Sequence, residues 1–244
     1  TAPEVLVGLR ELPRFEHRLN HATKLTRLAG GGHEDTTLAN PGSARFLLDL
    51  PDELALLAAA HFAGLFVVGG ALDVAGEPFL LAGFLEALEE FRDERSGHEI
   101  ERELLTFYDE ASDFFDFVKQ LRGRAEGKYL PTGYVPNTFY WLVEGEHFIG
   151  WLDIRHRLND NLLKIGGHIG YAIRPSERKW GYGSEILRLG LEMAKELGIT
   201  RVLLTCNDDN YASIKIIEKN GGVFENTAVT DTGIVKRRYW ITFK

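Results

Sequence analysis

The residues with the clearest chemical potential lie at positions 178–184, where two glycines stand two positions apart. Gly181 and Gly183 let the backbone approach a ligand closely and adopt dihedrals that a side chain would forbid. A helix is predicted over residues 183–197, and its first N–H groups have no internal partner and lie at the positive end of its dipole. This bend is therefore suited to a phosphate or pyrophosphate group. A purely structural turn is the alternative interpretation of the glycine pair.

Charge and sequence context narrow the chemistry of this bend. Arg174, Arg178 and Lys179 are expected to add positive charge beside it. The Walker loop needs a lysine and then Ser or Thr directly after its last glycine, but Gly183 is followed by Ser184. The dinucleotide fingerprint needs a glycine three residues further on, where this chain has isoleucine. Neither of these two phosphate loops fits.

Hydrophobic periodicity and turn residues predict the elements that position this bend. Helices are expected after Pro51 and over residues 77–93, 108–121, 183–197 and 210–219. Strands are expected over residues 65–68, 138–143, 148–154, 168–174, 199–206, 223–226 and 234–243. A hairpin followed by alternating strands and helices predicts a mixed α/β sheet.

The stretch resembles the phosphate-binding loop of the GNAT superfamily, the acetyl-CoA-dependent N-acetyltransferases. Arg178, Gly181 and Gly183 match that loop, and a strand precedes it as in the family. The resemblance covers residues 65–244 and is closest between residues 149 and 222. It implies an α/β fold with a mixed, mostly antiparallel sheet, flanked by helices, and an N-terminal extension. The family's splayed central pair of parallel strands would be residues 168–174 and 202–206.

The resemblance implies that acetyl-CoA is the co-substrate. Its pyrophosphate would lie on the amides of residues 179–184, and its pantetheine arm would complete the splayed strands. A backbone N–H near Ala172 and Ile173 would stabilise the oxyanion. The implied cofactor-binding residues are Ala172, Ile173, Arg178, Lys179, Trp180, Gly181, Tyr182, Gly183, Ser184, Asn210 and Ser213. Asn210 is also suited to cap the next helix, and the two roles are compatible.

The chain departs from the family pattern at the proton donor. Many members carry a tyrosine seven residues after the asparagine that matches Asn210, but Ile217 stands there. His168 and Tyr171, on the central strand, are the predicted replacements, since both side chains can transfer protons. A structural role for His168 is the alternative. His156, Cys206, water, or a protein that binds acetyl-CoA without turnover are further alternatives.

Charge is the only property of the sequence that narrows the identity of the acceptor substrate. Residues 86–116 hold twelve acids against three arginines, a charge of −9 before histidine. Because the family's first helices flank the acceptor site, a cationic amine is predicted: a polyamine, an aminoglycoside-like amine or a peptide amine. A solvated helical face is the alternative. Aromatic side chains that could line the acceptor side are Tyr134, Phe139, Tyr140 and Trp141.

Composition narrows the class of protein. The 244 residues carry 28 basic and 36 acidic side chains, and a net charge of −8 argues against nucleic acid as a partner. A single cysteine, Cys206, fits a reducing compartment, so a cytoplasmic location is expected. No cluster of metal ligands stands out, and no signal peptide is evident. An uncharged run at residues 54–72 is a weak membrane-spanning candidate, because its flanks are acidic.

These patterns predict two parts of the chain. Residues 1–64 form an extension of unknown role, and residues 65–244 form the GNAT-like domain. Three function classes stay open: an N-acetyltransferase, a non-catalytic acetyl-CoA sensor, and an interaction protein that assembles through the extension. The family is often dimeric, so a homodimer is a further hypothesis.

Overall fold

The computed structural model describes residues 63–67, 78–94, 99–144 and 147–243, and these residues form two β-sheets. All neighbouring strands in both sheets are antiparallel. The first sheet has the order β1 (Ala63–Val67), β2 (Asn137–Glu144), β3 (His147–Arg155) and β4 (Ile169–Ile173). The second sheet has the order β5 (Arg201–Asn207), β7 (Val235–Thr242) and β6 (Val223–Val229).

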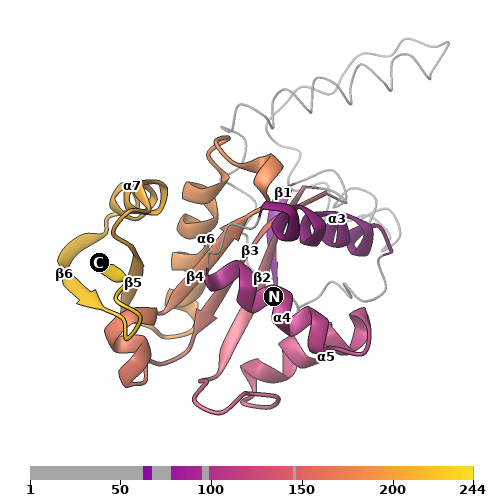
Figure 1. Ribbon diagram of the computed structural model, residues 1–244, viewed down its shortest axis with the longest axis horizontal. Helices are drawn as coiled ribbons and strands as arrows, with labels where there is room; N and C mark the ends of the chain where they lie inside the picture. Colours follow the sequence, from indigo (N-terminus) through magenta and orange to yellow (C-terminus); the bar gives the residue numbers. More distant parts are fainter. Residues whose placement is uncertain (1–62, 68–77, 95–98, 145–146, 244) are drawn as a thin grey trace, which may run out of the picture.

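Helices cover both faces of the first sheet (Figure 1). On one face lie α3 (Pro78–Glu94), α4 (Glu99–Glu110) and α5 (Phe114–Ala125), which pack against β3, β4 and β2 respectively. On the other face α6 (Tyr182–Glu196) packs against β3 and β4. The last helix, α7 (Tyr211–Lys219), contacts α6 and β5 and so joins the second sheet to the first.

The two faces have separate hydrophobic cores, because successive side chains of a strand point to opposite faces. On the α3–α5 face, Phe84 stacks on Trp141 with ring centroids 4.7 Å apart. On the α6 face, Leu152 and Ile186 are fully buried. β3 is buried along both faces, which explains its nearly continuous apolar sequence.

Most of the predicted elements are confirmed, but the helices before β2 are not as expected. Instead of one helix over residues 108–121, α4 ends at Glu110 and α5 starts at Phe114. The break has a local cause: the Asp113 side chain accepts a hydrogen bond from the Asp116 N–H at 2.8 Å and caps α5. Between β3 and β4 the chain also forms a π-helical turn, Leu162–Gly166.

The predicted boundary at residue 64 falls inside β1, which starts at Ala63 and pairs along its length with β2. The sheet therefore begins before that boundary. The expected helix after Pro51 lies outside the described residues, as does nearly all of the extension. Among the described helices, none has the length and apolar character needed to cross a bilayer. Nor do the described ranges contain a group of side chains arranged to hold a metal ion.

Candidate active site

The first and second sheets meet at the start of β4 and β5. The His168 N–H donates to the Leu203 carbonyl at 2.7 Å, and the Leu203 N–H donates to the His168 ring Nδ1 at 2.9 Å. Beyond this junction β4 and β5 belong to different sheets. A cavity of about 1010 Å³ is lined by residues of both strands, including Tyr171, Ile173 and Cys206. The cavity thus lies against both of the strands that were predicted to flank a gap.

The hydrogen-bond register of β4 shows which backbone groups face this cavity. The Arg155 N–H donates to the His168 carbonyl, and the Arg174 N–H donates to the Ile149 carbonyl. Between these two bonds an antiparallel ladder alternates, so the N–H groups of residues 170 and 172 point to β3. Those of Tyr171 and Ile173 point away from β3, toward the gap. The Ala172 N–H was predicted as an oxyanion donor, but it is directed to β3 in the ladder and not into the gap. Of the two predicted donors, Ile173 is the one whose N–H faces the gap.

The cavity passes through the gap from one face of the sheets to the other. Its lining includes Glu103 and Phe107 of α4, which lies on the α3–α5 face. It also includes Ser184 of α6 and Ser213 of α7 on the opposite side. A molecule in the cavity would thus meet two different chemical environments, one at each end.

The glycine-bearing bend lies along the α6 end of the cavity. Gly181 has a φ of 93° and precedes the first residue of α6, and Lys179 has a φ of 67°. The N–H groups of Ser184 and Glu185 donate back to the Gly181 carbonyl. Within the described part of the chain, no hydrogen bond is found for the N–H groups of Gly181 and Gly183, and both residues line the cavity.

Residue 183 is close to α7. A Cβ atom there would lie 2.7 Å from the end of the Ile216 side chain, so that side chain would have to move. Lys179 and Ser184 line the cavity as predicted, whereas Trp180 and Tyr182 are not among the lining residues. The Tyr182 side chain is buried in the α6 core, and that of Trp180 is partly exposed.

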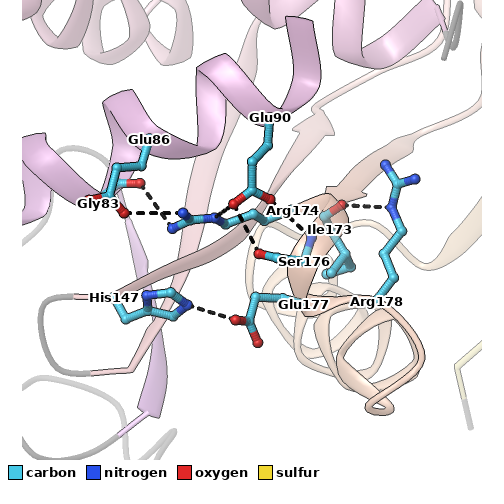
Figure 2. A network of polar contacts seen from close by, with 9 residues as sticks. All are labelled: Gly83, Glu86, Glu90, His147, Ile173, Arg174, Ser176, Glu177 and Arg178. Atoms are coloured by element: carbon cyan, nitrogen blue, oxygen red, sulfur yellow. Dashed lines mark hydrogen bonds and ion pairs between the residues drawn. The ribbon is translucent and has the colours of Figure 1, made fainter. Parts of the chain in front are cut away.

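Two arginines predicted to charge the bend are instead engaged by carboxylates of α3 and α4, and Figure 2 shows those of Arg174. The Arg174 side chain is buried, and its Nε and Nη2 donate to Glu90 at 2.7 Å and Glu86 at 3.1 Å. Arg178 donates from Nε to the Ile173 carbonyl at 3.0 Å and forms ion pairs with Glu94 and with Glu101.

The segment that leads into the bend is held at further points (Figure 2). The Ser176 N–H and hydroxyl both donate to Glu90. His147 Nε2 lies 2.9 Å from the carboxylate of Glu177, which is almost fully buried. Burial alone would raise the pKa of Glu90, but hydrogen bonds from Ser176 and Arg174 hold it below its usual value. These contacts fix the path of the chain from β4 to α6.

The cations that remain near the bend are lysines. Lys179 and Lys215 both line the cavity, and neither makes an ion pair within the residues described. Lys215 lies on α7 beside Ile216, whose side chain approaches Gly183. Sequence reasoning missed Lys215, because only the packing of α7 on α6 brings it near a bend more than thirty residues earlier.

The predicted helix cap at Asn210 is confirmed, since its side chain accepts from the Ser213 N–H at 3.0 Å. Both residues also line the cavity. The Tyr171 hydroxyl is buried near Ser213 and, within the described part, makes no hydrogen bond of normal geometry. Burial raises the pKa of Tyr171 above its ordinary value, so the phenol stays protonated. Burial likewise raises the pKa of the Cys206 thiol to about 11, which leaves it protonated.

His168 does not line the cavity. Its ring packs against Trp240 and accepts the Leu203 N–H, so it completes the junction of the two sheets. Burial and the nearby charge of Arg155 lower the pKa of His168 to about 4, so the ring is neutral near pH 7. The geometry therefore favours the structural interpretation of His168 over the catalytic one. His156 bonds Thr138 at 2.8 Å and is also absent from the lining.

The acidic stretch has a largely structural use. Arginines from outside it, at positions 155, 174 and 178, form ion pairs with five of its acids: Glu86, Glu90, Glu94, Glu101 and Glu103. Arg92, within the stretch, pairs with Glu89 and Asp109. Among the described acids of the stretch, Glu101 and Glu103 line the cavity. The charge near a bound acceptor therefore depends on the acids in the cavity lining and not on the net charge of −9 of residues 86–116.

Polar side chains gather at the α4 end of the cavity, and the sequence did not predict this cluster. Glu103, Tyr134, Asn137 and Arg155 line the cavity there, and Asp153 lies behind them. Asp153 and Arg155 are charged residues in an otherwise apolar strand, and that contrast was the available signal. Of the four predicted aromatic residues, only Tyr134 lines the cavity. Phe139, Tyr140 and Trp141 are buried in the core instead.

Comparison with known proteins places this geometry in a family. Residues 103–223, nearly half of the chain, match the family model described as an acetyltransferase (GNAT) domain. This part of the chain is therefore similar to GNAT acetyltransferase domains. The match agrees with the family that the loop motif indicated, and the expected acetyl-CoA co-substrate is consistent with it. No curated protein matches the chain.

Solved structures similar to this chain include acetyltransferases with bound coenzyme A. The ribosomal L7/L12 α-N-protein acetyltransferase RimL, in complex with coenzyme A, is 19% identical, with a TM-score of 0.40 over 53% of this chain and 72% of that one. An acetyltransferase from Salmonella typhimurium that modifies the N-terminal serine of L7/L12 is 20% identical, with a TM-score of 0.37 over 52% and 76%. A Bacillus subtilis acetyltransferase in complex with coenzyme A is 13% identical, with a TM-score of 0.38 over 44% and 78%.

Proposed function

We propose that this chain transfers an acetyl group from acetyl-CoA to an amine. The observation that carries the proposal is the cavity between β4 and β5, which has unpaired loop amides at one end and a polar cluster at the other. The chain's residues fit the co-substrate: the N–H groups of Gly181 and Gly183 suit a pyrophosphate, as do Lys179 and Lys215. Backbone groups of β4 that face the gap suit the amides of a pantetheine arm.

Each group in the gap has a role in the proposed transfer. Bound acetyl-CoA supplies an acyl group activated as a thioester. The Ile173 N–H, directed into the gap, is the proposed donor to the developing oxyanion. The Tyr171 hydroxyl is the proposed proton donor to the departing sulfur, in place of the tyrosine that Ile217 replaces. Asn210 and Ser213 are the proposed contacts of the arm.

The acceptor is proposed to be a cationic amine, supported by the two carboxylates, Glu101 and Glu103, in the cavity lining. The test is release of free thiol from acetyl-CoA over a panel of spermidine, kanamycin and a peptide with a free N-terminal amine, each at low and high salt. Turnover that is fastest for a polycation and falls with salt is expected. A preference for neutral or anionic acceptors would contradict the proposal that the acceptor is cationic. It would not contradict the proposal that the chain transfers an acetyl group.

A second candidate function is an acetyl-CoA sensor, favoured by the absence of a hydroxyl at Ile217. Calorimetric titration with acetyl-CoA beside the thiol assay separates the two candidates. Binding with turnover supports the transferase, and binding without turnover on any amine supports the sensor. A protein that does not bind acetyl-CoA contradicts both.

Replacing Tyr171 by phenylalanine should lower kcat by roughly 100-fold, because the leaving sulfur loses its proton donor. The Kd for acetyl-CoA should change little, since the ring and its packing are retained. Tyr140→Phe is the matched control: Tyr140 is also a buried strand tyrosine, but it does not line the cavity. Unchanged kcat in Tyr171→Phe would show that water or another group protonates the sulfur.

A further inference from the structure

The polar cluster at the α4 end of the cavity holds two carboxylates and the Arg155 guanidinium, and the guanidinium of Arg124 adds a further charge that acts on Glu103. Glu103 of α4 lies 3.7 Å from Arg155 Nη2, and Asp153 lies 3.4 Å from Arg155 Nε. Arg124 of α5 is buried and stacks over the Phe107 ring at 3.5 Å. The Arg155–Glu103 contact is an ion pair longer than a hydrogen bond, and the Glu103 carboxylate also lines the cavity, where an acceptor could reach it.

The surroundings of Glu103 make it a stronger base than an exposed glutamate. Burial raises the pKa of Glu103, and the charge of Asp153 raises it further, against the opposing effects of Arg155, Tyr134 and Arg124. Asp153 is almost fully buried, and its Oδ1 has no hydrogen-bond partner within the described residues. Burial and Glu103 raise the pKa of Tyr134 to about 12, so its hydroxyl stays protonated and can donate to Glu103.

The position of Glu103 relative to β4 suits proton transfer from an acceptor. α4 packs on the face of β4 to which Ala172 points, whereas Tyr171 points to the α6 face. The cavity joins these two faces through the gap. A proton acceptor and a proton donor thus lie on opposite sides of the strand edge where the reacting groups would meet.

We propose that Glu103 is a catalytic base that takes a proton from the ammonium group of the acceptor. This inference rests on the proposed acetyl transfer. The neutral nitrogen attacks the acetyl carbonyl, a carbon–nitrogen bond forms, and the carbon–sulfur bond breaks. Glu103 passes the first nitrogen proton to solvent. The attacking nitrogen releases its second proton to solvent as the carbon–sulfur bond breaks, and Tyr171, which has protonated the sulfur, regains a proton from solvent, so the net release is one proton. Asp153 is then a positioning residue that keeps Glu103 basic.

The test compares Glu103→Gln with Glu110→Gln, a control on the same helix whose side chain is exposed and outside the cavity lining. For the panel amine with the highest wild-type rate, kcat/KM should fall by roughly 100- to 1,000-fold in Glu103→Gln only. The Kd for acetyl-CoA should stay within about twofold of wild type in both variants. Glu103→Asp, which keeps the carboxylate, should recover part of the rate.

The pH profile distinguishes a base from a structural residue. In wild type, kcat/KM should rise with pH along a limb set by Glu103. In Glu103→Gln, kcat/KM should rise only near the pKa of the acceptor amine, because the amine must then lose its proton to solvent. The difference in kcat/KM between the variant and wild type should therefore become smaller at high pH. A parallel drop at every pH, or a rate within about threefold of wild type, overturns the proposal. If the wild-type protein does not bind acetyl-CoA, the proposed function itself is wrong. The results for the Glu103 variants test only the role of Glu103.

Discussion

The Gly181→Asp variant should bind acetyl-CoA at least about 100-fold more weakly than wild type, a loss of ~2.7 kcal/mol or more. Two effects add at this position. With a φ of 93°, residue 181 is in a backbone region that a side chain disfavours by about 1–3 kcal/mol. The new carboxylate would also lie among the amides proposed to hold a pyrophosphate, and like charges repel strongly there. Calorimetric titration measures the change.

Gly198→Asp is the matched control for this experiment. Gly198 follows the other end of α6 and has a φ of 80°, and a Cβ atom added there would meet open space. The substitution therefore carries the same backbone penalty and the same charge change without touching the cavity. Gly181→Ala, which adds only the backbone penalty, should weaken binding by a smaller factor. Equal affinity in Gly181→Asp and Gly198→Asp would mean that the bend does not hold the pyrophosphate.

Acid should destabilise this protein through His168. The folded-state pKa of His168, about 4, lies below its ordinary value of 6.5. The folded state therefore binds this proton less tightly than the unfolded state. The corresponding stability is fully present above pH 6.5 and is lost as pH falls from there to about 4. A shift of this size corresponds to about 3 kcal/mol. The pKa is lowered by burial and by the charge of Arg155, and a protonated Nδ1 could also no longer accept the Leu203 N–H.

His168→Asn isolates this effect, because the amide oxygen can accept the same N–H but the side chain does not titrate. The free energy of unfolding, measured by urea denaturation from about pH 4 to pH 8, should fall less steeply in the variant than in wild type. All other titrating groups are shared, so the difference between the curves reports His168. Acetyl transfer should persist in His168→Asn. Identical curves, or loss of turnover with the fold intact, would contradict the structural assignment.

The sequence alone determined the order of most elements and the family that the bend indicates. Alternating apolar residues, β-branched runs and turn residues act over short distances, so β2, β3, α6 and the Asn210 cap were predictable from neighbouring positions. The spacing of Arg178, Gly181 and Gly183 was enough to indicate the GNAT family. The break between α4 and α5 was missed, although its cause, the Asp113 cap, is equally local.

Tertiary structure decided what each charged or titratable residue does. Arg174 and Arg178 have acidic partners 77 to 88 positions away, and no local pattern specifies such pairs. No local pattern predicts the raised pKa of Glu103 either, because that pKa rises only when folding buries the side chain and brings Asp153 near it. His168 looked catalytic from its place on a strand, yet its ring completes a sheet junction with Leu203. Burial and electrostatic interaction depend on which distant segments meet in space, and periodicity along the chain does not encode that information.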